Sequence, residues 1–188
     1  MKHPFENLSP HTQRTAYWVS LAATFILIGL LQAMAAPYCD SLPGEPLKYN
    51  IIQYEFAGTV EKAQEIVDSW GAEGRAGLTK QILVDYAFAI AYPTAIAFAI
   101  LAVLKNTRNK ALLAGGRALA WLQPLAGVLD AVENYALLQM LKGVAYAPMP
   151  QVAYWCAAPK FVIVVAGIFF VLIFAGLGYT RDSEPADS

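Results

Sequence analysis

Four long apolar stretches constrain the fold of this chain more than any other feature. They cover residues 15–36, 78–104, 112–141 and 152–179. An α-helix needs about 20 residues to cross a bilayer, and each stretch is long enough. Backbone groups inside a bilayer must be paired within the protein, which favours helices for such stretches. Of the 188 residues, 14% are charged, against about 25% in soluble domains. The sequence therefore predicts an all-α, four-helix transmembrane bundle that forms one membrane domain over residues 15–179.

The segments outside these stretches are more hydrophilic. We predict cytoplasmic tails over residues 1–14 and 180–188, and an extracytoplasmic loop over residues 37–77. Within the loop, residues 49–56 fit either a short strand or a segment at the membrane interface. The first apolar stretch also allows a signal peptide, with small residues at 33–35 as the cleavage site. Its apolar core is longer than signal peptides use, which favours a transmembrane helix.

A short amphipathic helix is predicted inside the loop at about residues 59–70. Thr59 is a suitable N-cap residue and Gly71 a suitable C-terminal stop. The apolar positions between them share one stripe, formed by Val60, Ala63, Val67 and Trp70. Such a helix can lie on the lipid surface or cover the end of the bundle. Its acidic residues oppose attraction to anionic lipids, so we predict that it covers the bundle.

Polar residues interrupt the third apolar stretch at Asp130, Glu133 and Asn134. An ionisable residue near the centre of a membrane helix costs about 2.5 to 3.5 kcal/mol on insertion, so the two acids together cost about 5 to 7 kcal/mol. The spacing i, i+3 and i+4 places all three on one helical face. We therefore expect them to share one buried site that offsets this cost.

Other polar residues in the spans are expected at a similar depth. Asp85, Glu133 and Lys160 each lie about seven or eight residues from the extracytoplasmic end of their stretch, which is about 10 to 12 Å along a helix. Tyr92 shares an inward stripe with Asp85, and Gln32 is shallower but within reach of the same cavity. The candidate ligand-binding residues are thus Gln32, Asp85, Tyr92, Asp130, Glu133, Asn134 and Lys160.

Several functions fit such a site. The leading hypothesis is an intrabundle site in the extracytoplasmic leaflet that binds a lipid, a quinone or another small amphiphile. In it, Lys160 supplies a cation for an anionic head group or a carboxylate pair. The alternatives are an accessory or structural subunit, whose charges only fix helix packing, and a proton- or cation-coupled transporter. The sequence does not decide whether the protein is an enzyme. If it is one, Asp85 and Glu133 are the candidate acid-base residues.

Several ligand classes are disfavoured. Both histidines, His3 and His11, precede the first apolar stretch, which removes histidine ligation of haem or di-iron within the spans. We identify no cofactor and no metal site. The net charge of −1 gives no basic excess for nucleic acid. The expected partners are membrane lipids, a small amphiphilic ligand, and a membrane-protein partner or a second copy of the chain.

The predicted topology places Cys39 and Cys156 at the same end of their helices, on the side where disulfides persist. A disulfide between them and two independent buried thiols both remain open. The topology itself follows from the basic residues. With the two chain ends on one side, that side holds seven Lys and Arg residues against five on the other. The positive-inside rule then places both termini in the cytoplasm of a bacterial inner membrane.

Four strings of residues carry a resemblance to a family. They are EFAGTVEKAQEIVDSWG at 55–71, VDY at 84–86, LDAVEN at 129–134 and APKF at 158–161. The chain resembles a group of small bacterial four-span integral membrane proteins of unassigned function. The resemblance spans most of the chain and implies the four-span fold, but it implies no activity.

Overall fold

The computed structural model describes residues 2–39, 48–105, 107, 109–142 and 147–179. The predicted tail at 180–188 lies outside the described residues. Within them the chain forms a short 3-10 helix, η1 (Pro4–Asn7), and six α-helices. Two of these are short, α2 (Ile51–Glu55) and α3 (Val60–Ser69). Four are long: α1 (Pro10–Cys39), α4 (Gly71–Leu104), α5 (Lys110–Leu141) and α6 (Met149–Tyr179).

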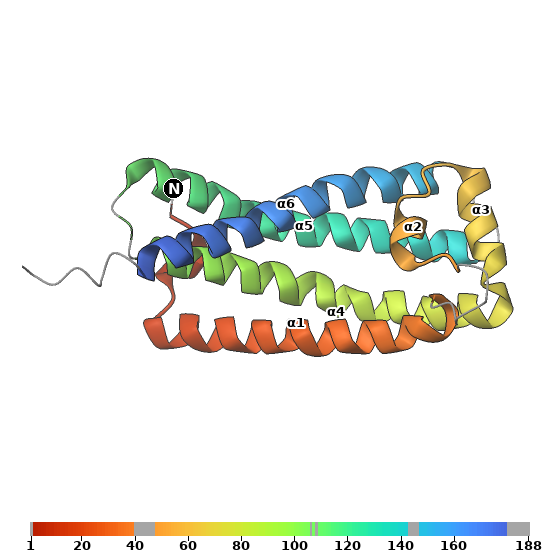
Figure 1. The fold of residues 1–188 in the computed structure, drawn as a ribbon, viewed down its shortest axis with the longest axis horizontal. Helices are drawn as coiled ribbons and strands as arrows, with labels where there is room; N and C mark the ends of the chain where they lie inside the picture. The colour runs from red at the N-terminus through yellow and green to blue at the C-terminus, as the bar shows by residue number, and fades with distance from the viewer. Residues whose placement is uncertain (1, 40–47, 106, 108, 143–146, 180–188) are drawn as a thin grey trace, which may run out of the picture.

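The four long helices run side by side as an elongated bundle (Figure 1). All four are long and apolar enough to cross a membrane, and the described residues contain no strand. Helix α4 packs along both α1 and α5, and α5 packs along α6. Among the described residues α1 packs mainly against α4, so it lines one side of the bundle. The predicted all-α, four-helix bundle is confirmed.

Small residues let the central helices approach closely. Pro93 has no backbone N–H, so the carbonyl of Ala89, four residues earlier in α4, lacks its intrahelical donor. Gly127 of α5 lies against this point, because a Cβ added to it would come within 2.4 Å of the Ala89 oxygen. Small residues serve the same purpose at many helix contacts in membranes. Any side chain at position 127 would therefore push α5 away from α4.

The helices α2 and α3 cover one end of the bundle, which we call the loop end; α3 lies across it (Figure 1). The side chain of Thr59 accepts a hydrogen bond from the N–H of Lys62 at 3.2 Å, as an N-cap does. The buried face of α3 includes Ala63, Ile66 and Val67, which join the apolar core at this end. The helix α3 therefore covers the end of the bundle, as the sequence predicted.

Residues 51–55 form the helix α2, so the strand suggested as one alternative for residues 49–56 was wrong. Asn50 caps this helix and accepts a hydrogen bond from the N–H of Gln53 at 2.9 Å. Tyr54 is fully buried, and its hydroxyl donates to the backbone oxygen of Leu137 in α5 at 3.0 Å. Contacts with the bundle therefore fix a helix too short to be stable alone.

The long helices extend beyond the predicted spans. Helix α4 begins at Gly71, whose φ is +62°, seven residues before the predicted start at 78. The glycines of this first part lower its helix propensity, which made it look like loop. Tertiary packing explains the glycines: a Cβ on Gly77 would come within 2.1 Å of the Tyr38 ring, and one on Gly74 within 2.7 Å of Trp70.

The residues of η1 and His3 before it are folded against the bundle, within the segment for which the sequence suggested a tail over residues 1–14. His3 is 1% exposed and its ring lies 4.8 Å from that of Trp121. Phe5 stacks on Phe98 with centroids 4.4 Å apart. Glu6 accepts from Arg117 through both carboxylate oxygens, the shortest contact being 2.8 Å. The residues that make these contacts lie far apart in the sequence, so no local sequence pattern reveals the contacts.

Candidate functional site

The ammonium of Lys160 is the centre of a buried charge cluster. It comes from α6 and lies 2.8 Å from a carboxylate oxygen of Glu133 and 3.0 Å from one of Asp130, both on α5. The exposed fractions of Lys160, Asp130 and Glu133 are 7%, 3% and 0%. The carboxylate pair expected around Lys160 is therefore present. At these distances inside an apolar bundle, the ion pairs offset the cost of burying each charge.

Asp85 and Asn134 form the adjoining part of the cluster. The side-chain amide of Asn134 donates to a carboxylate oxygen of Asp85 at 2.7 Å, which joins α5 to α4. Asn134 is 2% exposed. Asp130, Glu133 and Asn134 thus share one face of α5, as their spacing predicted. Asp85 approaches this face from α4.

Glu55 is the member of the cluster that the sequence did not reveal. It is the last residue of α2, and its carboxylate lies 3.9 Å from the ammonium of Lys160. The pKa of the Glu55 carboxyl is raised from 4.5 to about 7, mainly because the group is buried; Lys160 lowers the pKa, and Asp130 and Asp85 raise it. A signal was available, since Glu55 stands alone among apolar and aromatic residues next to Tyr54 and Phe56.

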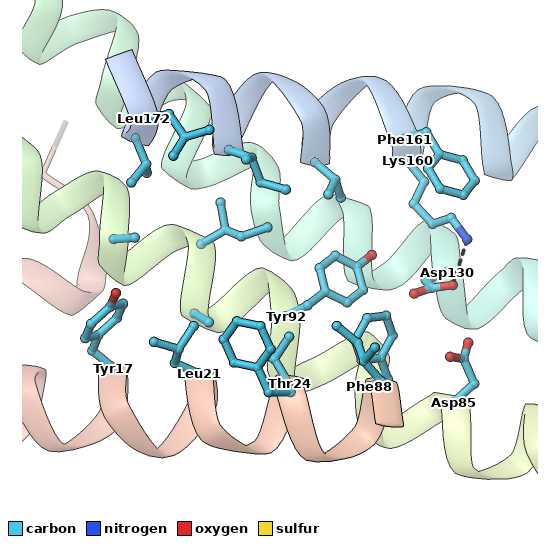
Figure 2. Close-up of a pocket in the computed structure, with 18 of the residues that line it drawn as sticks. Tyr17, Leu21, Thr24, Asp85, Phe88, Tyr92, Asp130, Lys160, Phe161 and Leu172 are labelled. Carbon is cyan, nitrogen blue, oxygen red and sulfur yellow. Dashed lines mark hydrogen bonds and ion pairs between the residues drawn. The ribbon is translucent and has the colours of Figure 1, made fainter. Parts of the chain in front are cut away.

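An elongated apolar cavity of about 590 Å³ leads away from this cluster between α1 and α6. Asp85, Asp130 and Lys160 lie at one end, and Tyr92 points its hydroxyl toward Asp130 (Figure 2). Beyond them the lining is apolar. From Lys160 to Leu172, twelve residues along α6, the cavity extends for about 18 Å. This length is more than half the thickness of a bilayer's hydrocarbon core, which is about 30 Å.

A second, smaller cavity of about 190 Å³ lies on the loop-end side of Asp85, and we call it the polar chamber. Its polar lining residues are Gln32, Glu55, Gln81, Asp85 and Asn134. Glu55 and Asp85 also line the apolar cavity, as do Ile28 and Phe88, so the two spaces adjoin. Gln32 thus lies beside Asp85, where the sequence analysis expected it within reach.

The cluster has more carboxyl groups than ammonium groups. Four carboxyls, those of Glu55, Asp85, Asp130 and Glu133, surround the one ammonium of Lys160. If all four carboxyls were ionised, three negative charges would be left uncompensated, which would be very costly in an apolar interior. Bound protons or a bound cationic group must therefore neutralise part of this negative charge. In the described part of the chain, no three His, Cys, Asp or Glu side chains are arranged to hold a metal ion.

Cys39 and Cys156 are not joined by a disulfide in the structure. Cys39 is packed in the apolar core at the loop end, and Cys156 is half-buried on α6. Of the two possibilities considered above, the structure has the separate thiols. Neither cysteine lines the apolar cavity or the polar chamber.

The fold and the cluster together define an integral membrane protein, a helical transmembrane bundle with a buried salt bridge. Comparison of the chain with protein-family models, with curated proteins and with solved structures finds no match. The resemblance to small bacterial four-span proteins therefore stays a prediction.

Proposed function

We propose that the protein binds one membrane amphiphile, with the apolar chain in the cavity between α1 and α6 and the polar head beside Asp85 and Asp130. The observation that carries this proposal is the connection between the two parts of the site. A cavity of about 590 Å³ is within the usual range for small-molecule sites, about 300 to 1,000 Å³. Its walls are apolar except at the end where the charged cluster lies.

The position of the cavity supports access from the lipid phase. Two of the residues that line it, Phe25 of α1 and Leu172 of α6, are each 66% exposed. Exposed apolar side chains on the outside of a transmembrane bundle face the hydrocarbon. The rim between α1 and α6 is therefore in contact with lipid chains, and a hydrophobic tail can enter without crossing water.

The principal alternative is an accessory or structural subunit, in which the buried charges only fix helix packing. Such a role explains the ion pairs of Lys160, but it does not require a long apolar cavity beside them. A transporter needs polar access from both sides. Toward the chain termini, the hydroxyls of Ser20 and Thr24 donate to carbonyl oxygens of their own helix, at 3.0 and 2.8 Å. Because these hydroxyls are already hydrogen-bonded, they are less able to line a polar path for a proton or a cation through that half of the bundle.

The proposed environment is a bacterial inner membrane, with both termini in the cytoplasm. The distribution of basic residues supports this orientation. The end that carries both termini holds Lys2, Arg14, Lys105, Lys110 and Arg117. With this orientation the charged cluster and the polar chamber lie in the extracytoplasmic leaflet.

A cavity-filling variant tests the proposal. We would purify the full chain in lipid nanodiscs and use native mass spectrometry, first as isolated and then with added hexadecan-1-ol. The variant Ala99→Phe adds bulk to the wall of the cavity. The control Ala102→Phe adds the same bulk to an exposed position of the same helix.

We expect a bound amphiphile in the wild type and in Ala102→Phe, and at least a fivefold lower occupancy in Ala99→Phe. The reason is that an aromatic ring removes the space that the chain would occupy. Equal occupancy in both variants, or no bound amphiphile in the wild type, would overturn the proposal. The structural-subunit alternative predicts the second of these results.

A further inference from the structure

The polar chamber is rich in hydrogen-bond acceptors. Gln81, which is 7% exposed, lines it and has a buried side-chain oxygen that accepts no hydrogen bond among the described residues. Asp85 and Glu55 add carboxylate oxygens. The amide donor of Asn134 is already used by Asp85, at 2.7 Å. A group that enters the chamber therefore meets two carboxyl groups and the unpartnered amide oxygen of Gln81, and buried acceptors without partners are costly.

The cation of the cluster is not directed into this chamber. Lys160 lines the apolar cavity but not the polar chamber. Its ammonium is held by Asp130 and Glu133 at 3.0 and 2.8 Å. An anionic head group in the chamber would face the carboxylates of Asp85 and Glu55, and the ammonium of Lys160, which lies 3.9 Å from Glu55, is already in contact with Asp130 and Glu133. The idea that Lys160 binds an anionic head group is therefore disfavoured by this arrangement.

We propose that the polar chamber binds a protonated amine, the head group of a cationic amphiphile whose chain lies in the apolar cavity. This inference rests on the proposed function and specifies the ligand class of the same site. An ammonium supplies donors for the buried oxygens of Gln81 and Glu55 that have no hydrogen-bond partner among the described residues, and it adds positive charge next to the four carboxyls. With about 30 Å³ for each water-sized group, a chamber of about 190 Å³ holds roughly six. A small ammonium group fits this space.

The route from the chamber to the cavity is consistent with one ligand occupying both. Asp85 and Glu55 border both spaces, and so do the apolar residues Ile28 and Phe88. A head group bound at Asp85 would thus have its first carbon atoms between Ile28 and Phe88. The chain would then continue along α6 toward Leu172.

The test compares three probes with the same chain: hexadecylamine, hexadecan-1-ol and hexadecanoate. Affinities are measured on the full chain in nanodiscs by native mass spectrometry. The variants Gln81→Leu and Asp85→Asn remove one acceptor and one charge from the chamber. The control Thr94→Val changes a side chain of α4 that lines neither space and bonds to the backbone of its own helix. The affinity of each variant is expressed relative to the wild type with the same probe. The wild-type affinities of the three probes are compared at equal mole fraction of probe in the bilayer, which cancels differences in membrane partitioning.

We expect hexadecylamine to bind most tightly. Its affinity should fall about tenfold or more in Asp85→Asn and severalfold in Gln81→Leu, because hydrogen bonds to charged groups are the strong ones. Thr94→Val should bind it like the wild type. Tightest binding of hexadecanoate, or unchanged hexadecylamine affinity in both chamber variants, would overturn the amine assignment. If the amine assignment fails but Ala99→Phe still lowers the binding of hexadecan-1-ol, the proposed function stands. If no probe responds to Ala99→Phe, both proposals fall.

Discussion

The ammonium of Lys160 lies 2.8 Å from the carboxylate of Glu133, a side chain that is fully buried between the helices. This contact joins α6 to α5 at the level where Asp85 approaches from α4. Three of the four long helices thus meet at one polar point inside an apolar bundle. The cluster therefore influences the stability of the bundle as well as any ligand.

Replacing Lys160 by Met should destabilise the protein strongly. The change leaves Glu133 and Asp130 without their cation, and breaking a buried pair in this way typically costs about 3 to 5 kcal/mol. The free energy of unfolding can be measured by titration with sodium dodecyl sulfate in mixed micelles. The triple variant Lys160→Met, Asp130→Asn, Glu133→Gln should recover much of the loss, since it removes the charges together.

Lys62→Met provides the matched control. Lys62 pairs with Glu65 at 2.9 Å, but the two side chains are 42% and 55% exposed, and solvent screens such a pair. Its loss should have a much smaller effect. A loss for Lys160→Met no larger than that for Lys62→Met would contradict the view that the cluster is a buried, mutually compensated set.

The pH dependence of stability should depend on Glu55. Because its pKa in the folded protein is raised from 4.5 to about 7, the folded state holds a proton over that interval that the unfolded state releases. Glu55 therefore contributes stability that is complete below about pH 4.5 and is lost as the pH rises through about 7. The charged groups that face Glu55 are those of Asp85, Asp130, Glu133 and Lys160.

In the variant Glu55→Gln, stability should decline less between pH 4.5 and 7 than it does in the wild type. Thermal unfolding in detergent, followed by circular dichroism at several pH values, measures this slope. The variant Glu61→Gln, at an exposed position of α3, offers a comparison in which one surface carboxylate is removed. An identical slope in all three proteins would show that Glu55 does not hold its proton in this interval.

Gly127→Ala should weaken the contact between α4 and α5. The added methyl group would lie 2.4 Å from the carbonyl oxygen of Ala89, so the helices would have to separate. Overpacking of this kind typically costs about 1 to 3 kcal/mol. The same substitution at Gly115, also on α5, meets no atom within 4 Å and should be neutral or slightly stabilising. Unfolding titrations of both variants test this, and equal stabilities would argue against the close approach at Gly127.

The sequence was sufficient for the bundle and for much of the cluster. Membrane helices follow from the length and apolarity of a stretch, and helical rise placed Asp85, Glu133 and Lys160 at one depth before any contact was known. The face shared by Asp130 and Asn134 followed from their spacing. These predictions depend only on distances along a helix, which the sequence contains.

Glu55 and the N-terminal segment were missed because their positions depend on contacts between distant parts of the chain. Helix α2 has five residues, too few for a clear periodic signal, and Tyr54 fixes it through the backbone of Leu137. The first residues look like a polar tail until Glu6 meets Arg117, 111 positions away. The first part of α4 was also missed, and there Gly77 provides the space for the ring of Tyr38.

The gap between α1 and α6 has a consequence for how affinity should be measured. A guest that comes in sideways from the hydrocarbon, past Phe25 and Leu172, searches in two dimensions, and its relevant concentration is its mole fraction among the lipids. Titrations against total aqueous concentration would then report mainly on partitioning. Diluting the same amount of probe into more bilayer should lower occupancy, even when the volume of buffer is unchanged.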